Sequence, residues 1–156
     1  MTMAQTASTE PGGHFVEVSR VFDAPRDFVF DAFTRPELLR KWWAPEGLTP
    51  GDMVFEPRIG GACRFEMIEP GGSRYTAVGT VATYDPGHAI AFTWAWLLDD
   101  GGKGPETLVS IVFTDDGDGT RVTLTHSGFA DAETAAQHER GWSTMFNRFG
   151  DAGRIT

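Results

Sequence analysis

Cysteine is almost absent from this sequence, in which Cys63 is the only one. A single thiol cannot form a disulfide within the chain, and it cannot supply the set of cysteines that holds a structural zinc ion. The stretch Asp116-Gly117-Asp118 resembles the start of a calcium-binding loop, but the glycine and the glutamate that such a loop needs at its sixth and twelfth positions are missing. We therefore predict no metal ion.

Positive charge and long hydrophobic runs are also scarce. Lysine and arginine number 13 against 22 aspartates and glutamates, which gives a formal net charge of −9. An acidic surface repels phosphate groups, so we predict that neither nucleic acid nor a membrane is a partner. The longest apolar stretch, residues 89–98, is too short to span a bilayer.

The beginning of the chain lacks the basic start and the apolar core of a secretory signal. We predict a flexible tail over residues 1–13 and a cytoplasmic location. The chain has 156 residues, which is long enough for one domain with a sizeable hydrophobic core. We expect that domain to span residues 14–156.

The signature motifs of common enzyme classes are missing as well. The sequence contains no phosphate-binding P-loop and no G-x-S-x-G nucleophile motif, and His138-Glu139 lacks the second histidine of an H-E-x-x-H zinc motif. We therefore predict no cofactor. The sequence leaves open whether the protein is an enzyme.

The sequence does contain a regular succession of β and α patterns. Residues 14–22 are rich in valine and phenylalanine, as in a strand. Helical spacing of apolar residues then predicts two short helices, at 25–33 and 35–43, the second opened by a capping box of Thr34 and Glu37. Between residues 53 and 128, alternating segments separated by turn residues predict six further strands.

A helical pattern over residues 131–149 comes last. His138, Trp142, Met145 and Phe149 lie at helical spacing and form a single apolar stripe. Six strands joined by short turns form an antiparallel meander, and its apolar face must be covered. We predict an α+β fold in which a seven-stranded curved antiparallel sheet surrounds a long C-terminal helix, with two short helices after strand 1.

Aromatic residues are numerous, with 5 tryptophans and 12 phenylalanines. Large rings that carry an N–H group often line a cavity, although they also serve as core anchors. Alternation along the strands and spacing along the last helix direct one set of side chains toward a common interior, where we predict a ligand cavity of roughly 300–1,000 Å³. The candidate ligand-binding residues are Phe65, Tyr75, Trp94, Trp96, Ile111, His126, His138, Trp142 and Met145.

Two of these residues, His126 and His138, leave alternatives open for the chemistry of the cavity. Either could serve as an acid–base group, with Tyr75 as a further proton donor, and His126 could instead orient a polar-headed ligand. Alternatively, each histidine could donate one hydrogen bond and simply pack. We assign no catalytic residue from the sequence.

Several motifs resemble those of a known family. The segment from Ala24 to Trp43, APRDFVFDAFTRPELLRKWW, is similar to the opening of START-like (SRPBCC) proteins, and most similar to the branch named after the activator of the 90-kDa heat-shock-protein ATPase. The resemblance covers about residues 14 to 150, and its other motifs are Gly60-Gly61, Phe92-Thr93-Trp94, Leu124-Thr125-His126-Ser127-Gly128-Phe129 and His138-x-x-Gly141-Trp142-x-x-Met145.

The resemblance implies a helix-grip fold with a cavity between the sheet and the last helix. The superfamily includes lipid carriers, polyketide cyclases and hormone receptors, so it implies binding of a hydrophobic or aromatic small molecule. A cofactor-free enzyme of the polyketide cyclase or hydrolase kind and a chaperone-interacting regulatory module are the alternatives. The expected partner is an apolar small molecule, with a homodimer and a chaperone as further candidates.

Overall fold

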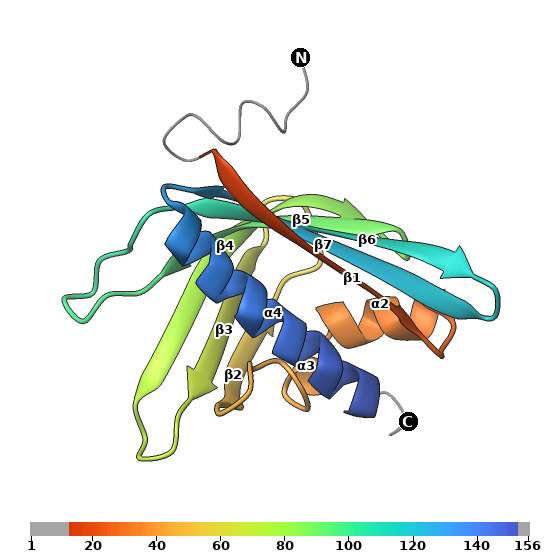
Figure 1. The fold of residues 1–156 in the computed structure, drawn as a ribbon, viewed down its shortest axis with the longest axis horizontal. Coiled ribbons are helices and arrows are strands. Elements are labelled where there is room, and N and C mark those ends of the chain that lie inside the picture. Colours follow the sequence, from red (N-terminus) through yellow and green to blue (C-terminus); the bar gives the residue numbers. More distant parts are fainter. Residues whose placement is uncertain (1–12, 153–156) are drawn as a thin grey trace.

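The computed structural model describes residues 13–152 and shows a curved sheet with a long helix across its open side (Figure 1). The strands are β1 (His14–Phe22), β2 (Thr49–Phe55), β3 (Ala62–Ile68), β4 (Arg74–Asp85), β5 (Ala89–Trp96), β6 (Thr107–Asp116) and β7 (Gly119–Phe129). The helices are α2 (Arg26–Thr34), α3 (Pro36–Leu39) and α4 (Ala132–Ala152). Apart from Gly13, the predicted tail lies outside the described residues.

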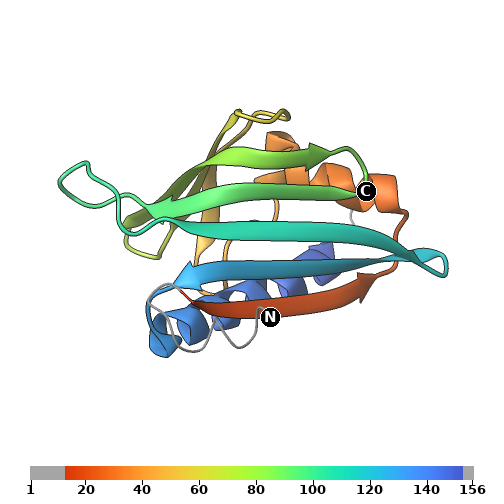
Figure 2. The ribbon, with the colours of Figure 1, turned by 90° about the horizontal axis from the view of Figure 1, so that it is seen from above.

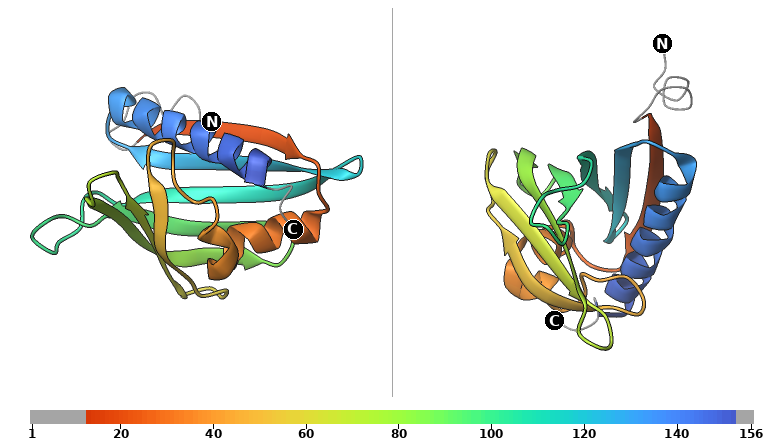
Figure 3. Two further views of the ribbon diagram at one scale, coloured as in Figure 1. Left: turned by 90° about the horizontal axis from the view of Figure 1, so that it is seen from below. Right: turned by 90° about the vertical axis from the view of Figure 1, so that its left-hand side faces the viewer.

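All seven strands belong to one antiparallel sheet with the order β1-β7-β6-β5-β4-β3-β2. The chain therefore forms a meander from β2 to β7, and β1 pairs with β7 rather than with β2. Figure 2 shows β1 and β4 to β7 side by side, and Figure 3 shows the sheet curving around α4. The predicted helix-grip α+β fold is confirmed.

The boundary between the two short helices differs from the prediction. Thr34 is the last residue of α2, and its hydroxyl donates to the carbonyl of Phe30 (2.9 Å), so it does not cap the next helix. α3 has Arg35 at its N-cap position without a side-chain hydrogen bond, and it covers four residues instead of 35–43. A threonine near a helix end can bond the carbonyl four residues back, and here this local bond replaces the capping box.

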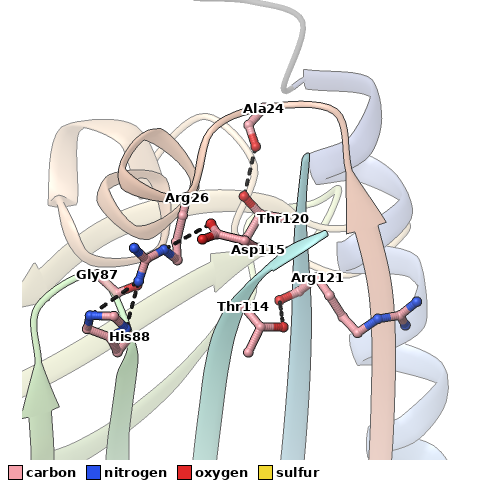
Figure 4. A network of polar contacts seen from close by, with 8 residues as sticks. All are labelled: Ala24, Arg26, Gly87, His88, Thr114, Asp115, Thr120 and Arg121. Atoms are coloured by element: carbon pink, nitrogen blue, oxygen red, sulfur yellow. Dashed lines mark hydrogen bonds and ion pairs between the residues drawn. The ribbon is translucent and has the colours of Figure 1, made fainter. Parts of the chain in front are cut away.

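Arg26, at the start of α2, connects that helix to two turns of the sheet (Figure 4). Its Nη1 atom lies 2.7 Å from Nδ1 of His88, and its Nε atom pairs with the carboxylate of Asp115 at 3.2 Å. Nearby, the hydroxyl of Thr120 donates to the carbonyl of Ala24 (2.8 Å). These contacts fix α2 against the turn between β4 and β5 and against the hairpin between β6 and β7.

The core lies between the concave face of the sheet and the helices. Trp42 and Trp43 follow α3 and are buried there, and the indole N–H of Trp42 donates to the carbonyl of Ala32 (3.1 Å). α4 begins after Asp131, whose carboxylate accepts a hydrogen bond from the backbone N–H of Thr134 (2.7 Å) and so caps the helix. The apolar stripe predicted for this helix faces the sheet over successive turns of the helix.

Candidate ligand-binding site

A pocket of about 320 Å³ lies between the first half of α4 and the strands β3 and β5. The residues that line it come from the loop after α3, from β3, from β5 and from α4: Pro45, Met67, Trp94, Trp96, Gln137, His138, Gly141, Trp142 and Met145. Alternation along β5 directs Trp94 and Trp96 to the same face, and the helical period brings five residues of α4 opposite them. The volume falls within the range predicted from the sequence.

Three indole rings, those of Trp94, Trp96 and Trp142, belong to the wall of this pocket. The ring centroid of Trp94 lies 5.3 Å from that of Trp96 at an interplanar angle of 87°, and 5.3 Å from that of Trp142 at 54°. Edge-to-face and tilted contacts of this kind are the favoured geometry for aromatic pairs. The rings therefore hold one another in defined orientations.

His126 is fully buried directly behind this wall, with its ring centroid 5.6 Å from Trp94 and 5.9 Å from Trp142. The indole N–H of Trp142 donates to Nδ1 of His126 (3.0 Å). Because an indole nitrogen can only donate, Nδ1 is the unprotonated nitrogen and Nε2 carries the proton. Nε2 then donates to the hydroxyl of Thr107 (2.7 Å), which donates in turn to the carbonyl of Trp94 (3.1 Å).

His138 lines the pocket and also has both ring nitrogens bonded. The indole N–H of Trp96 donates to its Nε2 atom (3.1 Å), and its Nδ1 atom lies 2.9 Å from the carbonyl of Thr134. A carbonyl can only accept, so Nδ1 carries the proton. Each histidine therefore positions one indole of the pocket: His126 positions Trp142, and His138 positions Trp96.

Burial makes both imidazoles poor bases. It lowers the pKa of His126 to about 3, with the charge of His138 as a smaller cause. Burial also lowers the pKa of His138, although its hydrogen bond to the carbonyl of Thr134 acts in the opposite direction. At neutral pH both rings are uncharged, and each of their nitrogens already has a partner.

The structure brings together five of the nine candidate residues at this pocket, namely Trp94, Trp96, His138, Trp142 and Met145. Phe65 and Ile111 are buried in the core, and Phe65 stacks on Trp94 with their centroids 5.7 Å apart. Like His126, Phe65 supports the wall from behind, whereas Ile111 pairs with Ile90 near the other end of β5.

Tyr75 lies in register with Met67, beside the pocket but outside its lining. Its side chain is 44% exposed, and its hydroxyl donates to Oε1 of Glu69 (3.1 Å). This hydrogen bond, together with the charge of Glu69, raises the pKa of Tyr75. The proposed role as a proton donor in the cavity is therefore not what the geometry favours.

Sequence reasoning missed four of the lining residues: Pro45, Met67, Gln137 and Gly141. Met67 lies two residues after Phe65 on the same face of β3, and Gly141 lies three residues after His138 on the predicted stripe of α4. The periodicity of the strand and of the helix could therefore have predicted both. Pro45 belongs to a loop, for which periodicity gives no direction.

A larger hollow of about 580 Å³ lies at the other end of the molecule, between the end of β1 and the last turns of α4. Its lining includes the charged residues Arg20, Asp23 and Asp151, and the guanidinium of Arg20 donates to the side chain of Asn147. Both hollows have aromatic residues in their lining, but only the smaller pocket has a lining without charged groups, so it is the better candidate for an apolar ligand.

Comparison with protein families identifies the class to which this chain belongs. A family model described as "Activator of Hsp90 ATPase homolog 1-like protein" matches residues 23–152. The chain is therefore a member of this family, within the START-like (SRPBCC) superfamily. Proteins with this fold commonly bind hydrophobic ligands.

Several solved structures are similar along most of the chain. The AHSA1 protein of Silicibacter pomeroyi is 26% identical, with a TM-score of 0.83 over 90% of this chain and 98% of that one. A protein of Chromobacterium violaceum is 25% identical, with a TM-score of 0.78 over 88% of this chain and 94% of that one.

A third structure, DynU16, is described as a putative protein in the dynemicin biosynthetic locus. It is 23% identical, with a TM-score of 0.74 over 90% of this chain and 47% of its own, so the likeness shows the fold alone. No curated protein matches the chain. Among the described residues, no helix has the length and apolar character needed to cross a membrane.

Proposed function

We propose that this protein binds a hydrophobic, chiefly aromatic small molecule in the pocket between α4 and the sheet. The observation that carries the proposal is a space of about 320 Å³ walled by three indoles and two methionines. Aromatic rings and thioether sulfurs make favourable contacts with flat apolar ligands.

The hydrogen bonding of the two histidines favours binding over a cofactor-free cyclase or hydrolase. A general base needs a nitrogen that can reach the proton of a substrate and a pKa near the working pH. His126 and His138 have both nitrogens engaged, and burial lowers the pKa of each. Their role in this proposal is to hold Trp142 and Trp96 in place.

The proposal is tested by tryptophan fluorescence and thermal unfolding with a panel of flat aromatics and fatty acids. A ligand that binds only the folded state should stabilise it by about 2.7 kcal/mol at a hundred times its dissociation constant. Trp96→Ala should weaken binding, because Trp96 lines the pocket, whereas Leu98→Ala should not, because Leu98 is 48% exposed and lies outside it. Equal affinities of the two variants, or no response to any compound, would contradict the proposal.

A further inference from the structure

The lining of the pocket contains no aspartate, glutamate, lysine or arginine among the described residues. His138 contributes an imidazole whose nitrogens are both bonded, and Gln137 is exposed. An anionic ligand group in this pocket would lose its hydration without gaining a counter-charge, which is strongly unfavourable. A cationic group would gain only cation–π contacts with the indole faces, which are weak compared with the same loss of hydration. If the proposed function holds, the pocket should therefore discriminate by charge.

The volume of the pocket sets the size of the ligand. An apolar protein cavity of about 150 Å³ accommodates benzene. The present pocket, at about 320 Å³, is roughly twice as large. Two fused aromatic rings therefore match the available space, whereas a single ring would leave much of the indole surface uncovered.

Gly141 belongs to this wall, and neither its backbone conformation nor its packing requires a glycine. It lies in the interior of α4, where glycine is less favourable than alanine, and its φ angle is not positive. A Cβ atom built there would find its nearest neighbour at 3.8 Å, the Cβ of Pro45, which is an ordinary contact. Gly79, in contrast, would place a Cβ at 1.7 Å from a backbone oxygen.

Space in the pocket is thus the remaining reason for glycine at this position. A methyl group occupies roughly the volume of one water, about 30 Å³, which is about a tenth of the pocket. We propose that the pocket is specific for an uncharged aromatic molecule of about two fused rings, and that Gly141 is the residue that leaves room for the second ring. This inference rests on the proposed function and narrows its ligand class.

The experiment is isothermal titration calorimetry with three naphthalene probes that share one ring system. Naphthalene-2-carboxamide is neutral, naphthalene-2-carboxylate is an anion and 2-naphthyltrimethylammonium is a cation. The protein is used as wild type, as Gly141→Ala and as Gly150→Ala. Gly150 is a matched control because it lies in the last turn of the same helix, outside the pocket, and its added Cβ would also make an ordinary contact, 3.7 Å from Phe22.

We expect the wild type to bind the carboxamide at least tenfold more tightly than either charged probe. Gly141→Ala should weaken the binding of the carboxamide at least fivefold, and Gly150→Ala should change the affinity for the carboxamide less than twofold. The melting temperatures of both variants should equal or exceed that of the wild type, because alanine favours the helix.

Three binding results would overturn the inference and leave the proposed function standing. They are a charged probe that binds as tightly as the carboxamide, a Gly141→Ala variant with wild-type affinity, and a failure of all naphthalene probes when other apolar compounds bind. A melting temperature of Gly141→Ala below that of Gly150→Ala would also overturn it, since Gly141 would then be needed for packing. If no compound of any size or charge binds, the proposed function itself is wrong.

Discussion

At the scale of single residues, the two inward histidines show how buried polar groups shape this pocket. Each imidazole accepts one indole N–H and donates one hydrogen bond, so His126 fixes Trp142 and His138 fixes Trp96. Buried polar groups that are fully bonded make a core rigid and specific. The large rings of the wall are therefore held in defined positions even though they border an open space.

This arrangement makes stability depend on pH. An unfolded histidine titrates near pH 6.5, whereas burial lowers the pKa of His126 in the folded protein to about 3. Between these values the unfolded chain binds the extra proton, so stability is complete above about pH 6.5 and falls as the pH decreases. One such histidine contributes a slope of up to about 1.4 kcal/mol per pH unit.

Urea unfolding of the wild type and of His126→Gln, at intervals from pH 7.5 to 4.5, measures this slope. Glutamine can accept from Trp142 and donate to Thr107 without titrating. The variant should be less stable at pH 7, but its stability should decrease with pH less steeply, by about 1.4 kcal/mol per unit. Parallel curves for the two proteins would show that His126 does not titrate in this way.

At the scale of elements, the strand β4 depends on one glycine. The Cβ of any other residue at position 79 would overlap the carbonyl oxygen of Thr93 on β5, at 1.7 Å. Beside it, the backbone N–H of Thr80 donates to Thr93 Oγ1 (2.9 Å), and the register of the two strands shifts between Val81 and Thr83. This irregularity lies in the part of the sheet that carries Trp94 and Trp96.

Gly79→Ala should therefore destabilise the protein by about 2 kcal/mol or more, because a backbone atom cannot move aside as a flexible side chain can. Gly104→Ala is the control, since its Cβ would lie 3.7 Å from the carbonyl oxygen of Trp96, an ordinary contact. We expect the control to stay within about 0.5 kcal/mol of the wild type in urea unfolding. Similar losses in the two variants would contradict this account of β4.

Periodicity predicted the elements well where the apolar pattern was long. Alternation along the strands and the stripe through Trp142 and Met145 fixed which faces meet, and the helix α4 was predicted at 131–149 and is found at Ala132–Ala152. The prediction was wrong at the junction of α2 and α3, because Thr34 bonds back to Phe30 instead of capping the next helix. A single hydroxyl has two such partners within reach, and the sequence does not distinguish them.

At the scale of the whole molecule, the pattern indicated which face a residue occupies but not its depth behind the pocket wall. Phe65, Ile111 and His126 lie on the predicted face and yet are buried in the core outside the lining. Tyr75 is the second residue of β4, next to the turn between β3 and β4, and its side chain is exposed although its register partner Met67 is buried. Depth depends on sheet curvature and on the loop with Pro45, and both arise from tertiary packing.

The family and the fold agree with the expectations drawn from the sequence, and the fold class is commonly used for hydrophobic ligands. A cytoplasmic location, a homodimer and contact with a chaperone stay predictions. The ligand pocket is the claim on which the account depends, because the roles given to His126, His138 and Gly141 all follow from it.

The most direct test of that claim is a crystal structure of the protein with the aromatic compound that binds most tightly in solution. We expect the ring system of the ligand between α4 and β5, in contact with Trp94, Trp96 and Trp142, with the hydrogen bonds of His126 and His138 retained. A ligand found instead in the hollow beside Arg20 and Asn147, or a pocket closed by its own side chains, would contradict it.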